Sequence, residues 1–131
     1  ESNHRIRKIT PADRIEDRVV STFAGSGTAN SGNGTGTAAQ FYFPGGVAVD
    51  SSDNVFVADS GNNRIRKITP ADRIDDRVVS TLAGSSAGFA DDIGTEAQFD
   101  FPYGVAVDSS DNVYVADYGN NRIRKITPAD K

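Results

Sequence analysis

The chain has 131 residues, a formal net charge of −4 and no cysteine. The absence of cysteine excludes disulfide bonds and thiolate metal sites, and the negative charge disfavours long-range attraction to nucleic acid or to an anionic membrane. Apolar runs are only a few residues long, which excludes a membrane-spanning helix within this sequence.

Residues 5–25, at the start of the chain, are a partial copy of a passage that recurs. They match 64–84 except at Glu16/Asp75 and Phe23/Leu82. A longer passage at 41–72 returns at 99–130. Its copies differ only at Tyr42/Asp100, Gly45/Tyr103, Phe56/Tyr114 and Ser60/Tyr118. A near-constant period of 58–59 residues predicts a repeat protein whose units bury their apolar faces by stacking on each other.

The repeats predict short strands separated by turns. In chain order we expect strands at 5–10 and 18–24 in the partial copy, then at 46–50, 54–59, 64–69 and 78–84 in the complete copy. Valine and isoleucine alternate with other residues in these segments, and Asp, Ser, Asn and Gly bracket them. The last copy repeats the first three of the four strands. Each complete unit is therefore predicted to be a four-stranded antiparallel meander.

The predicted strands carry apolar side chains on both faces. Val55 and Val57 point one way and Phe56 the other, so the sheet needs a cover on each side. No segment shows a convincing helical apolar stripe, and further copies of the sheet must supply the cover. A two-sheet sandwich would need a polar outer face that this alternation does not provide. We therefore expect an all-β fold of β-propeller blades.

The residues 46–68 closely resemble the NHL repeat. The motif that ends each unit is present as Asn62–Ile65 and Asn120–Ile123, and as Asn3–Ile6 near the start. The resemblance implies a propeller, most often of six blades, and no single activity. Family members include protein-binding and RNA-binding modules, and related propellers include lyases and lactonases. The unusual uniformity of the copies suggests a designed protein, a reconstructed ancestor or a recent duplication.

In blade order the strands read c-d, a-b-c-d, a-b-c. The chain then divides into a partial repeat at 1–25, a first repeat at 26–84, and a second repeat at 85–131 that lacks its last strand. Two blades would expose apolar end faces and unpaired strand edges. We therefore expect homo-oligomerisation to complete the ring, with a homotrimer of six blades favoured over four-blade, eight-blade or open assemblies.

The expected contact between copies is a strand exchange. The d strand at 18–24 of one chain would pair with the c strand at 122–127 of its neighbour, and the N-terminal c strand would be displaced or would compete. This assembly clasp is predicted to involve Val19, Val20, Phe23, Ile123 and Ile126.

Several polar positions could carry chemistry, and each has a simpler structural interpretation. His4 is the only histidine and is expected to be a turn residue, and 50–54 lacks the ligand spacing of a calcium loop. The acidic segment 91–96 is expected to be a solvated rim loop. Left-handed turn geometry is expected at Asp53, Asp72, Asp92 and Asp111.

The basic strand residues Arg64, Arg66 and Lys67 are expected to pair with Asp59 or with Asp75 and Asp76 rather than with phosphate groups. Tyr103 and Tyr118 occur where the copies differ and adjoin turns, so they could line a binding rim or pack within a blade.

These patterns favour a non-enzymatic, self-assembling repeat protein that uses no metal or other cofactor. We expect no binding to a membrane, and the negative charge disfavours binding to nucleic acid. The alternative is a module that binds protein, glycan or RNA through its rim loops or central funnel. A metal-dependent lyase or lactonase is disfavoured, because nearly identical blades do not readily build one asymmetric site. The sequence names no ligand and no cellular compartment.

Overall fold

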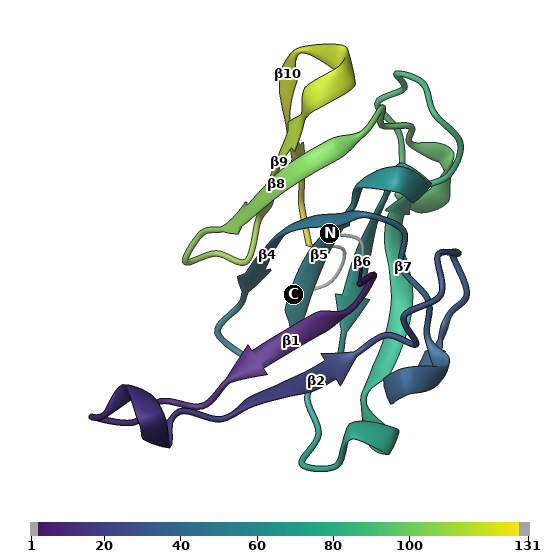
Figure 1. The fold of residues 1–131 in the computed structure, drawn as a ribbon. Coiled ribbons are helices and arrows are strands. Elements are labelled where there is room, and N and C mark those ends of the chain that lie inside the picture. Colours follow the sequence, from purple (N-terminus) through teal and green to yellow (C-terminus); the bar gives the residue numbers. More distant parts are fainter. Residues whose placement is uncertain (1–2, 129–131) are drawn as a thin grey trace.

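The computed structural model describes residues 3–128, which form ten strands in three antiparallel sheets (Figure 1). Short 3-10 turns connect several of the strands, and no helix within the described range is long and apolar enough to cross a membrane. The strands are β1 (Ile6–Ile9), β2 (Val20–Ala24), β3 (Gly34–Thr35), β4 (Pro44–Val49), β5 (Val55–Asp59), β6 (Arg64–Ile68), β7 (Val78–Gly84), β8 (Pro102–Val107), β9 (Val113–Asp117) and β10 (Arg122–Ile126).

The middle sheet is the complete meander that the sequence predicts. Its strand order is β3-β7-β6-β5-β4, and consecutive strands from β4 to β7 pair antiparallel. The first sheet contains only β1 and β2, and the last only β8, β9 and β10. We call β4–β7 the middle blade and β8–β10 the last blade.

Strand β3 was not predicted. Its two residues, Gly34 and Thr35, lie in the glycine-rich connection and pair with Val79 and Val78 at the outer edge of β7. Two residues are too few to show the alternation by which strands are recognised in a sequence. The connection thus adds a fifth strand to the edge of the middle blade.

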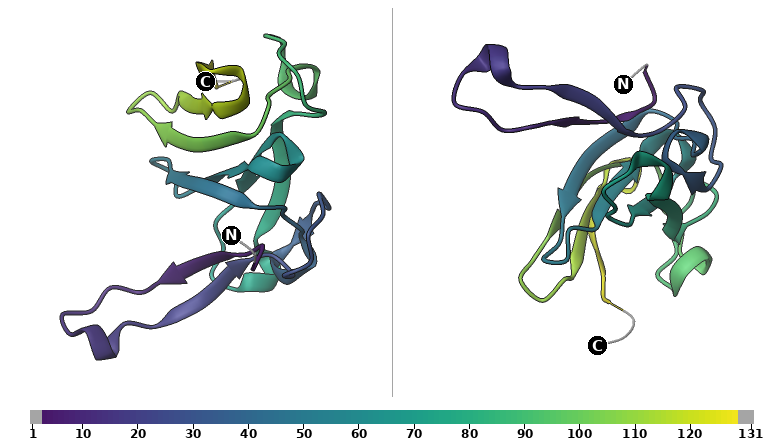
Figure 2. Two further views of the ribbon diagram at one scale, coloured as in Figure 1. Left: turned by 45° about the horizontal axis from the view of Figure 1, so that its top comes forward. Right: turned by 90° about the horizontal axis from the view of Figure 1, so that it is seen from below.

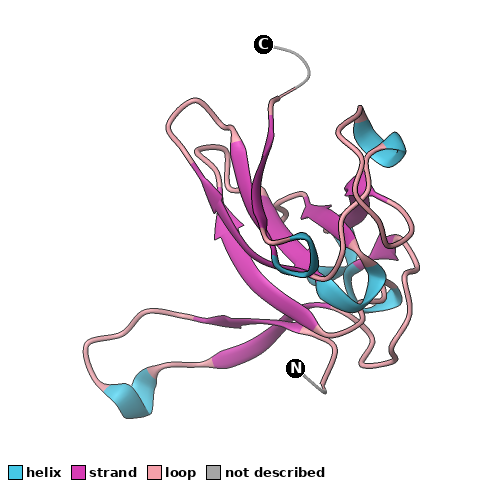
Figure 3. Ribbon diagram, turned by 90° about the horizontal axis from the view of Figure 1, so that it is seen from above, coloured by secondary structure: helices cyan, strands magenta, loops and turns pink. Residues whose placement is uncertain are grey.

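The three sheets stack on one another, with the β1–β2 sheet and the last blade on opposite sides of the middle blade (Figure 2, left). The predicted two-faced burial of β5 is confirmed. Val57 belongs to the core cluster shared with Ile6 and Phe41, and Phe56 to the cluster shared with Val113 and Val115. The core therefore lies between the sheets rather than on one side of each. Figure 3 shows the strands of these sheets from above, in magenta.

Two of the four aspartates expected in left-handed turns adopt that geometry. Asp53 and Asp111 have φ angles of 67° and 66°, whereas Asp72 and Asp92 do not have positive φ. Both left-handed residues lie in the tight turns between the first two strands of a blade. The prediction is wrong for the other two because they lie in longer connections, where the backbone need not reverse over a few residues.

Candidate functional sites

Exposed aromatic side chains gather where β4 and β8 begin. This surface, the aromatic end, consists of Tyr42, Phe43, Phe101 and Tyr103 with the imidazole of His4. The four Tyr and Phe side chains are 39%, 37%, 39% and 50% exposed. The His4 ring centroid lies 5.8 Å from that of Tyr42 and 5.2 Å from that of Phe43. The first strands of the two blades are neighbours here, because a Cβ on Gly46 would lie only 3.0 Å from Cα of Gly104.

Phe43 and Phe101 share a strained backbone. Both have a φ of 51°, which costs an L-residue roughly 1–2 kcal/mol and is rare for bulky side chains. The Phe43 N–H donates to His4 Nδ1 at 3.1 Å, and the Phe101 N–H donates to Asn63 Oδ1 at 2.7 Å. The second residue of the preceding repeat motif, His4 or Asn63, thus holds each phenylalanine in place. His4, expected to be a turn residue, is itself left-handed, with a φ of 51°.

The residue before each strained phenylalanine is held by two further hydrogen bonds. The Tyr42 N–H donates to Asp59 Oδ1 at 2.8 Å, and the Tyr42 carbonyl accepts the Gly61 N–H at 2.8 Å. Asp100 makes the same pair of contacts in the last blade, to Asp117 and Gly119. The aromatic end is therefore rigidly presented by its own backbone.

A buried ion pair lies beneath this surface in the middle blade. Arg66 Nη1 and Asp59 Oδ2 are 2.7 Å apart, and both side chains are fully buried. Burial raises the pKa of the Asp59 carboxyl, while hydrogen bonds from Asn62, the Tyr42 N–H and Arg66 oppose that rise. Arg66 also donates to the carbonyl of Gln40 and, in the connection that enters the blade, to the Gly32 carbonyl.

The expected pairing of the basic strand with Asp59 is confirmed for Arg66. The alternative partners, Asp75 and Asp76, make no ion pair with this strand in the part of the chain that the structure describes. Arg66 is buried and links the connection that enters the blade to the blade itself.

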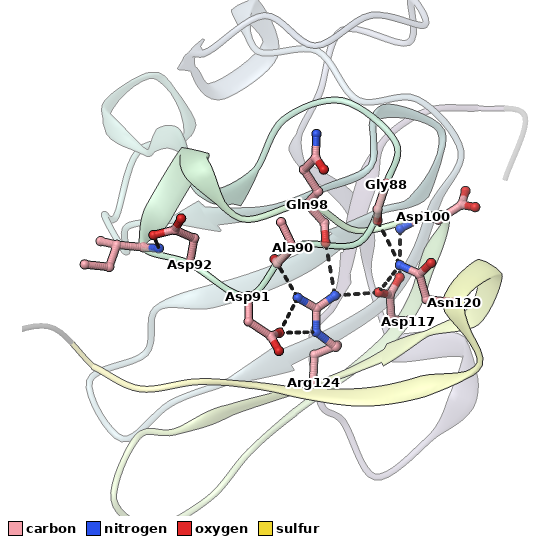
Figure 4. A network of polar contacts seen from close by, with 10 residues as sticks. Gly88, Ala90, Asp91, Asp92, Gln98, Asp100, Asp117, Asn120 and Arg124 are labelled. Carbon is pink, nitrogen blue, oxygen red and sulfur yellow. Dashed lines mark hydrogen bonds and ion pairs between the residues drawn. The ribbon is translucent and has the colours of Figure 1, made fainter.

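Arg124 repeats this network in the last blade (Figure 4). Its Nη1 lies 2.7 Å from Asp117 Oδ2, and it donates to the carbonyls of Gln98 and Ala90. Asp91 Oδ1 accepts from Arg124 Nη2 at 2.7 Å and from Nε at 3.0 Å. Asp91 is 78% exposed, so the expectation that 91–96 is a solvated loop holds for this residue, although its carboxylate also binds the arginine.

The second candidate site is the outer edge of β10, which we call the open edge. Among the described residues β10 pairs with β9 and with no strand on its other side. This edge borders a groove of about 1240 Å³, which Leu82 of β7 and Ile93 of the connection also line. Ile123 is 74% exposed here, whereas its counterpart Ile65 is fully buried against Val113 and Val115 of the last blade.

Glycines in the two connections mark the same difference. Gly36 and Gly94 both have a φ of 52°. A Cβ on Gly36 would lie 2.5 Å from the carbonyl oxygen of Ile74, in the turn before β7. A Cβ on Gly94 would meet nothing within 4 Å. The open edge is thus the position that a fourth strand and its preceding turn occupy in the middle blade.

The structure places the predicted clasp residues in two different sheets. Ile123 and Ile126 lie on β10, and Ile126 packs partly against the second core cluster. Val19, just before β2, is 58% exposed, and Val20, the first residue of β2, is 51% exposed. Phe23 on β2 is partly buried, with the Arg77 guanidinium 4.2 Å above its ring. Within the chain, β2 pairs with β1.

The two tyrosines predicted for a binding rim are exposed. Tyr103 belongs to the aromatic end, and Tyr118, 72% exposed, has its ring centroid 6.4 Å from that of Phe101. Sequence reasoning missed Tyr42 and the two strained phenylalanines. Position 42 differs between the copies and could have been included with the tyrosines. The left-handed phenylalanines carry no signal, because a residue before proline usually adopts extended backbone.

The turn segments 50–54 and 108–112 use their carboxylates internally. Asp108 accepts the Ser110 and Asn112 N–H groups and the Asn112 side-chain amide, and Asp50 makes the same contacts in the first of these turns. Hydrogen bonds from Asn112 lower the pKa of Asp108 to about 2, and hydrogen bonds from Tyr114 and Ser110 make smaller contributions to this decrease. Residues 3–128 contain no group of three or more His, Cys, Asp or Glu side chains placed to hold a metal ion.

The stacked antiparallel meanders define the chain as a β-propeller repeat protein. The NHL repeat profile matches residues 41–68 and 99–126. The chain is an NHL-repeat protein, as its sequence motifs indicate. It is 38% identical over 85 residues to "NHL repeat-containing protein 2" from Gallus gallus. The aligned region covers 64% of this chain and 11% of that relative.

Three solved structures, two from Bacteroides thetaiotaomicron VPI-5482 and one from Bacteroides ovatus ATCC 8483, share the fold. One, a protein of unknown function, has a TM-score of 0.80 and 30% identity over 95% of this chain and 30% of its own. The second, an auxiliary nutrient binding protein, has a TM-score of 0.78 and 23% identity over 95% of this chain and 32% of its own.

The third, from Bacteroides ovatus, is also an auxiliary nutrient binding protein, with a TM-score of 0.79 and 22% identity over 98% of this chain and 33% of its own. The chain thus spans about a tenth of the length of the curated relative and about a third of each solved structure.

Proposed function

We propose that this chain is a non-enzymatic propeller module whose open edge takes the β2 segment of a second copy. The observation that carries the proposal is the contrast between β6, whose outer edge pairs with β7, and β10, which repeats its sequence and has no strand on that side within residues 3–128. The β7 segment 77–84 and the segment 18–25 differ only at Leu82/Phe23. The chain thus carries a second copy of the strand that covers the equivalent edge.

The exchange balances in backbone hydrogen bonds, and burial of Ile123 replaces that of Ile6, which the displaced β1 would expose. The donor strand pairs with 5–9 within its own chain and would pair with 122–126 of the neighbour, and both segments read Arg-Ile-Arg-Lys-Ile. In the exchanged pair Ile123 would take the position that Ile6 holds against the middle blade of the neighbour. Burying one such side chain contributes about 1.5–3 kcal/mol. A homotrimer closing six blades is the assembly that we expect.

Native mass spectrometry of the 131-residue polypeptide tests the assembly. We expect a species of three times the 13.9 kDa chain mass over a micromolar concentration series. A second closed stoichiometry would support strand exchange and correct the blade number. A folded polypeptide that remains a single chain at every concentration would overturn the proposal.

Gly94→Asn gives a sharper test. Asparagine tolerates left-handed backbone, and its side chain would fill the space that the turn before the donor strand needs. We expect this variant to fold and to lose association. Ser109→Asn, at an exposed turn of the same blade, is the matched control and should associate normally. Equal association of both variants would contradict the proposed use of the open edge.

A second candidate function is ligand binding at the aromatic end, and the observation that favours it is the repeated, strained presentation of Phe43 and Phe101 to solvent. Strain of this kind is concentrated at functional sites in proteins. The two similar structures of nutrient binding proteins are compatible with a binding role, whereas another similar structure, 22% identical, is of a putative phosphatase. Phosphatase assays with metal supplements test the enzymatic alternative. If no variant at the aromatic end or the open edge abolishes the turnover, the activity comes from a contaminating enzyme.

A further inference from the structure

The aromatic end has features that specify the chemistry of a ligand, and this inference rests on the proposed binding role of that surface. We propose that it binds a neutral polysaccharide, laid across the aromatic rings of successive blades. The argument rests on the rigidity, the charge and the repetition of the surface.

The rings are fixed before any ligand arrives. Each blade holds the two residues before its first strand through three backbone hydrogen bonds, to the side chains at positions 4 and 59 and the turn at Gly61 in the middle blade. Tyr42 and Tyr103 are seated on glycines: a Cβ on Gly61 would lie 2.6 Å from the Tyr42 ring. Binding therefore requires little ordering of the surface, which favours affinity.

The charge of the surface disfavours a phosphate-bearing ligand. The residues of the aromatic end include no lysine or arginine, and the carboxylate beside them belongs to Asp100. Nucleic acids also stack on aromatic rings, but they need cationic groups along the backbone. Hydroxyl groups of a neutral sugar can instead donate to Asp100 and exchange hydrogen bonds with Tyr42 and Tyr103. Among the described residues those two phenol hydroxyls form no hydrogen bond within the chain.

The shape of the surface fits a sugar ring. Aromatic faces carry negative charge density and attract the weakly positive C–H groups on the flat face of a pyranose. Phe43 and Phe101 occupy equivalent positions in adjacent blades, 58 residues apart in the chain. Only the phenylalanine recurs in both blades, because Asp100 stands at the position of Tyr42 and Gly45 at that of Tyr103. One recurring ring per blade matches a repeating polymer better than a single compact ligand, and each further blade would add an equivalent ring.

Affinity electrophoresis in gels that contain a neutral polysaccharide tests this inference, with laminarin, xyloglucan, xylan and galactomannan as probes. We expect retardation by at least one of them. The double variant Phe43→Leu with Phe101→Leu keeps apolar bulk but removes the flat faces, and should weaken retention at least about tenfold. Phe89→Leu is the control for loss of a ring, because Phe89 lies against Arg122 and Arg124 and lines the groove of the open edge rather than the aromatic end.

Three results would overturn the inference: no retardation by any of the four polymers, equal retardation of the double variant and wild type, or retention of oligouridylate instead of the polymers. Native mass spectrometry of the same variants separates this inference from the assembly proposal. If the double variant of the aromatic end associates normally but is no longer retarded by the polysaccharide, the result supports polysaccharide binding. An assembly that forms without any retention overturns the ligand inference and leaves the open-edge proposal standing.

Discussion

The middle blade and the last blade contain nearly the same residues in different surroundings. The segment Arg-Ile-Arg-Lys-Ile pairs with β7 in the middle blade, where Ile65 is buried against the last blade and Arg66 against the connection before its own blade. In the last blade the same segment forms the open edge, and Ile123 is 74% exposed. A third copy, at 5–9, pairs with β2, yet Arg7 is exposed while Ile6 is buried against the middle blade. Burial here is set by the blade or connection that packs on each side chain rather than by local sequence, and this can be measured.

The largest difference should come from the buried arginines. Arg66→Ala leaves the Asp59 carboxylate buried without its partner, which we expect to cost about 3–5 kcal/mol of unfolding free energy. Arg124→Ala should cost less in the single chain, because Arg124 borders the groove and water can take the place of its guanidinium beside Asp117, which is itself fully buried. Urea unfolding at low protein concentration measures both. Equal losses would show that the open edge does not weaken the second network.

The isoleucines at the next position provide a second comparison. Ile65→Ala should cost about 2–5 kcal/mol because the side chain is fully buried. Ile123→Ala should change the stability of the single chain by less than about 0.5 kcal/mol. At concentrations where the chain associates, the cost at Ile123 should rise toward that at Ile65. A cost that is independent of concentration would argue against burial of this edge by a second copy.

The glycines of the two connections should differ by a smaller amount. Both are left-handed, so alanine costs roughly 1–2 kcal/mol at either position from the backbone conformation. Gly36→Ala adds a clash with the Ile74 carbonyl and should therefore be the more destabilising of the two. Thermal unfolding of the two variants measures the difference. A larger loss for Gly94→Ala than for Gly36→Ala would contradict the assignment of the open edge.

The smallest effect concerns one hydroxyl group. Tyr114 donates to Asp108 Oδ2 at 3.0 Å, and the middle blade has Phe56 at the equivalent position. Because the folded-state pKa of Asp108 is about 2, below its usual 3.8, its stabilising contribution is present above about pH 4 and is lost as pH falls through about 2. Tyr114→Phe should raise this pKa, as measured by NMR titration of the carboxyl carbon. An unchanged pKa of Asp108 in this variant would show that the hydrogen bonds from Asn112 and Ser110 are enough to lower it.

The sequence predicts the meander, the two-faced core and the Arg66–Asp59 pair, since strand alternation and charge are local signals that recur in each copy. It does not predict β3, which forms only because β7 offers an unpaired edge to Gly34 and Thr35. The left-handed phenylalanines of the aromatic end were also missed. Their conformation depends on acceptors at His4 and Asn63, one blade earlier in the chain.

The reach of Arg66 and Arg124 into the connections that precede their blades has an evolutionary consequence. Each connection shares its buried polar partners with the three strands that follow it, so a genetic duplication that starts just after Gly25 or Gly84 transfers a self-contained ionic network. A breakpoint inside a hairpin would separate arginine from carboxylate. New blades can therefore be inserted by recombination in these connections, where the two copies already differ in length by one residue.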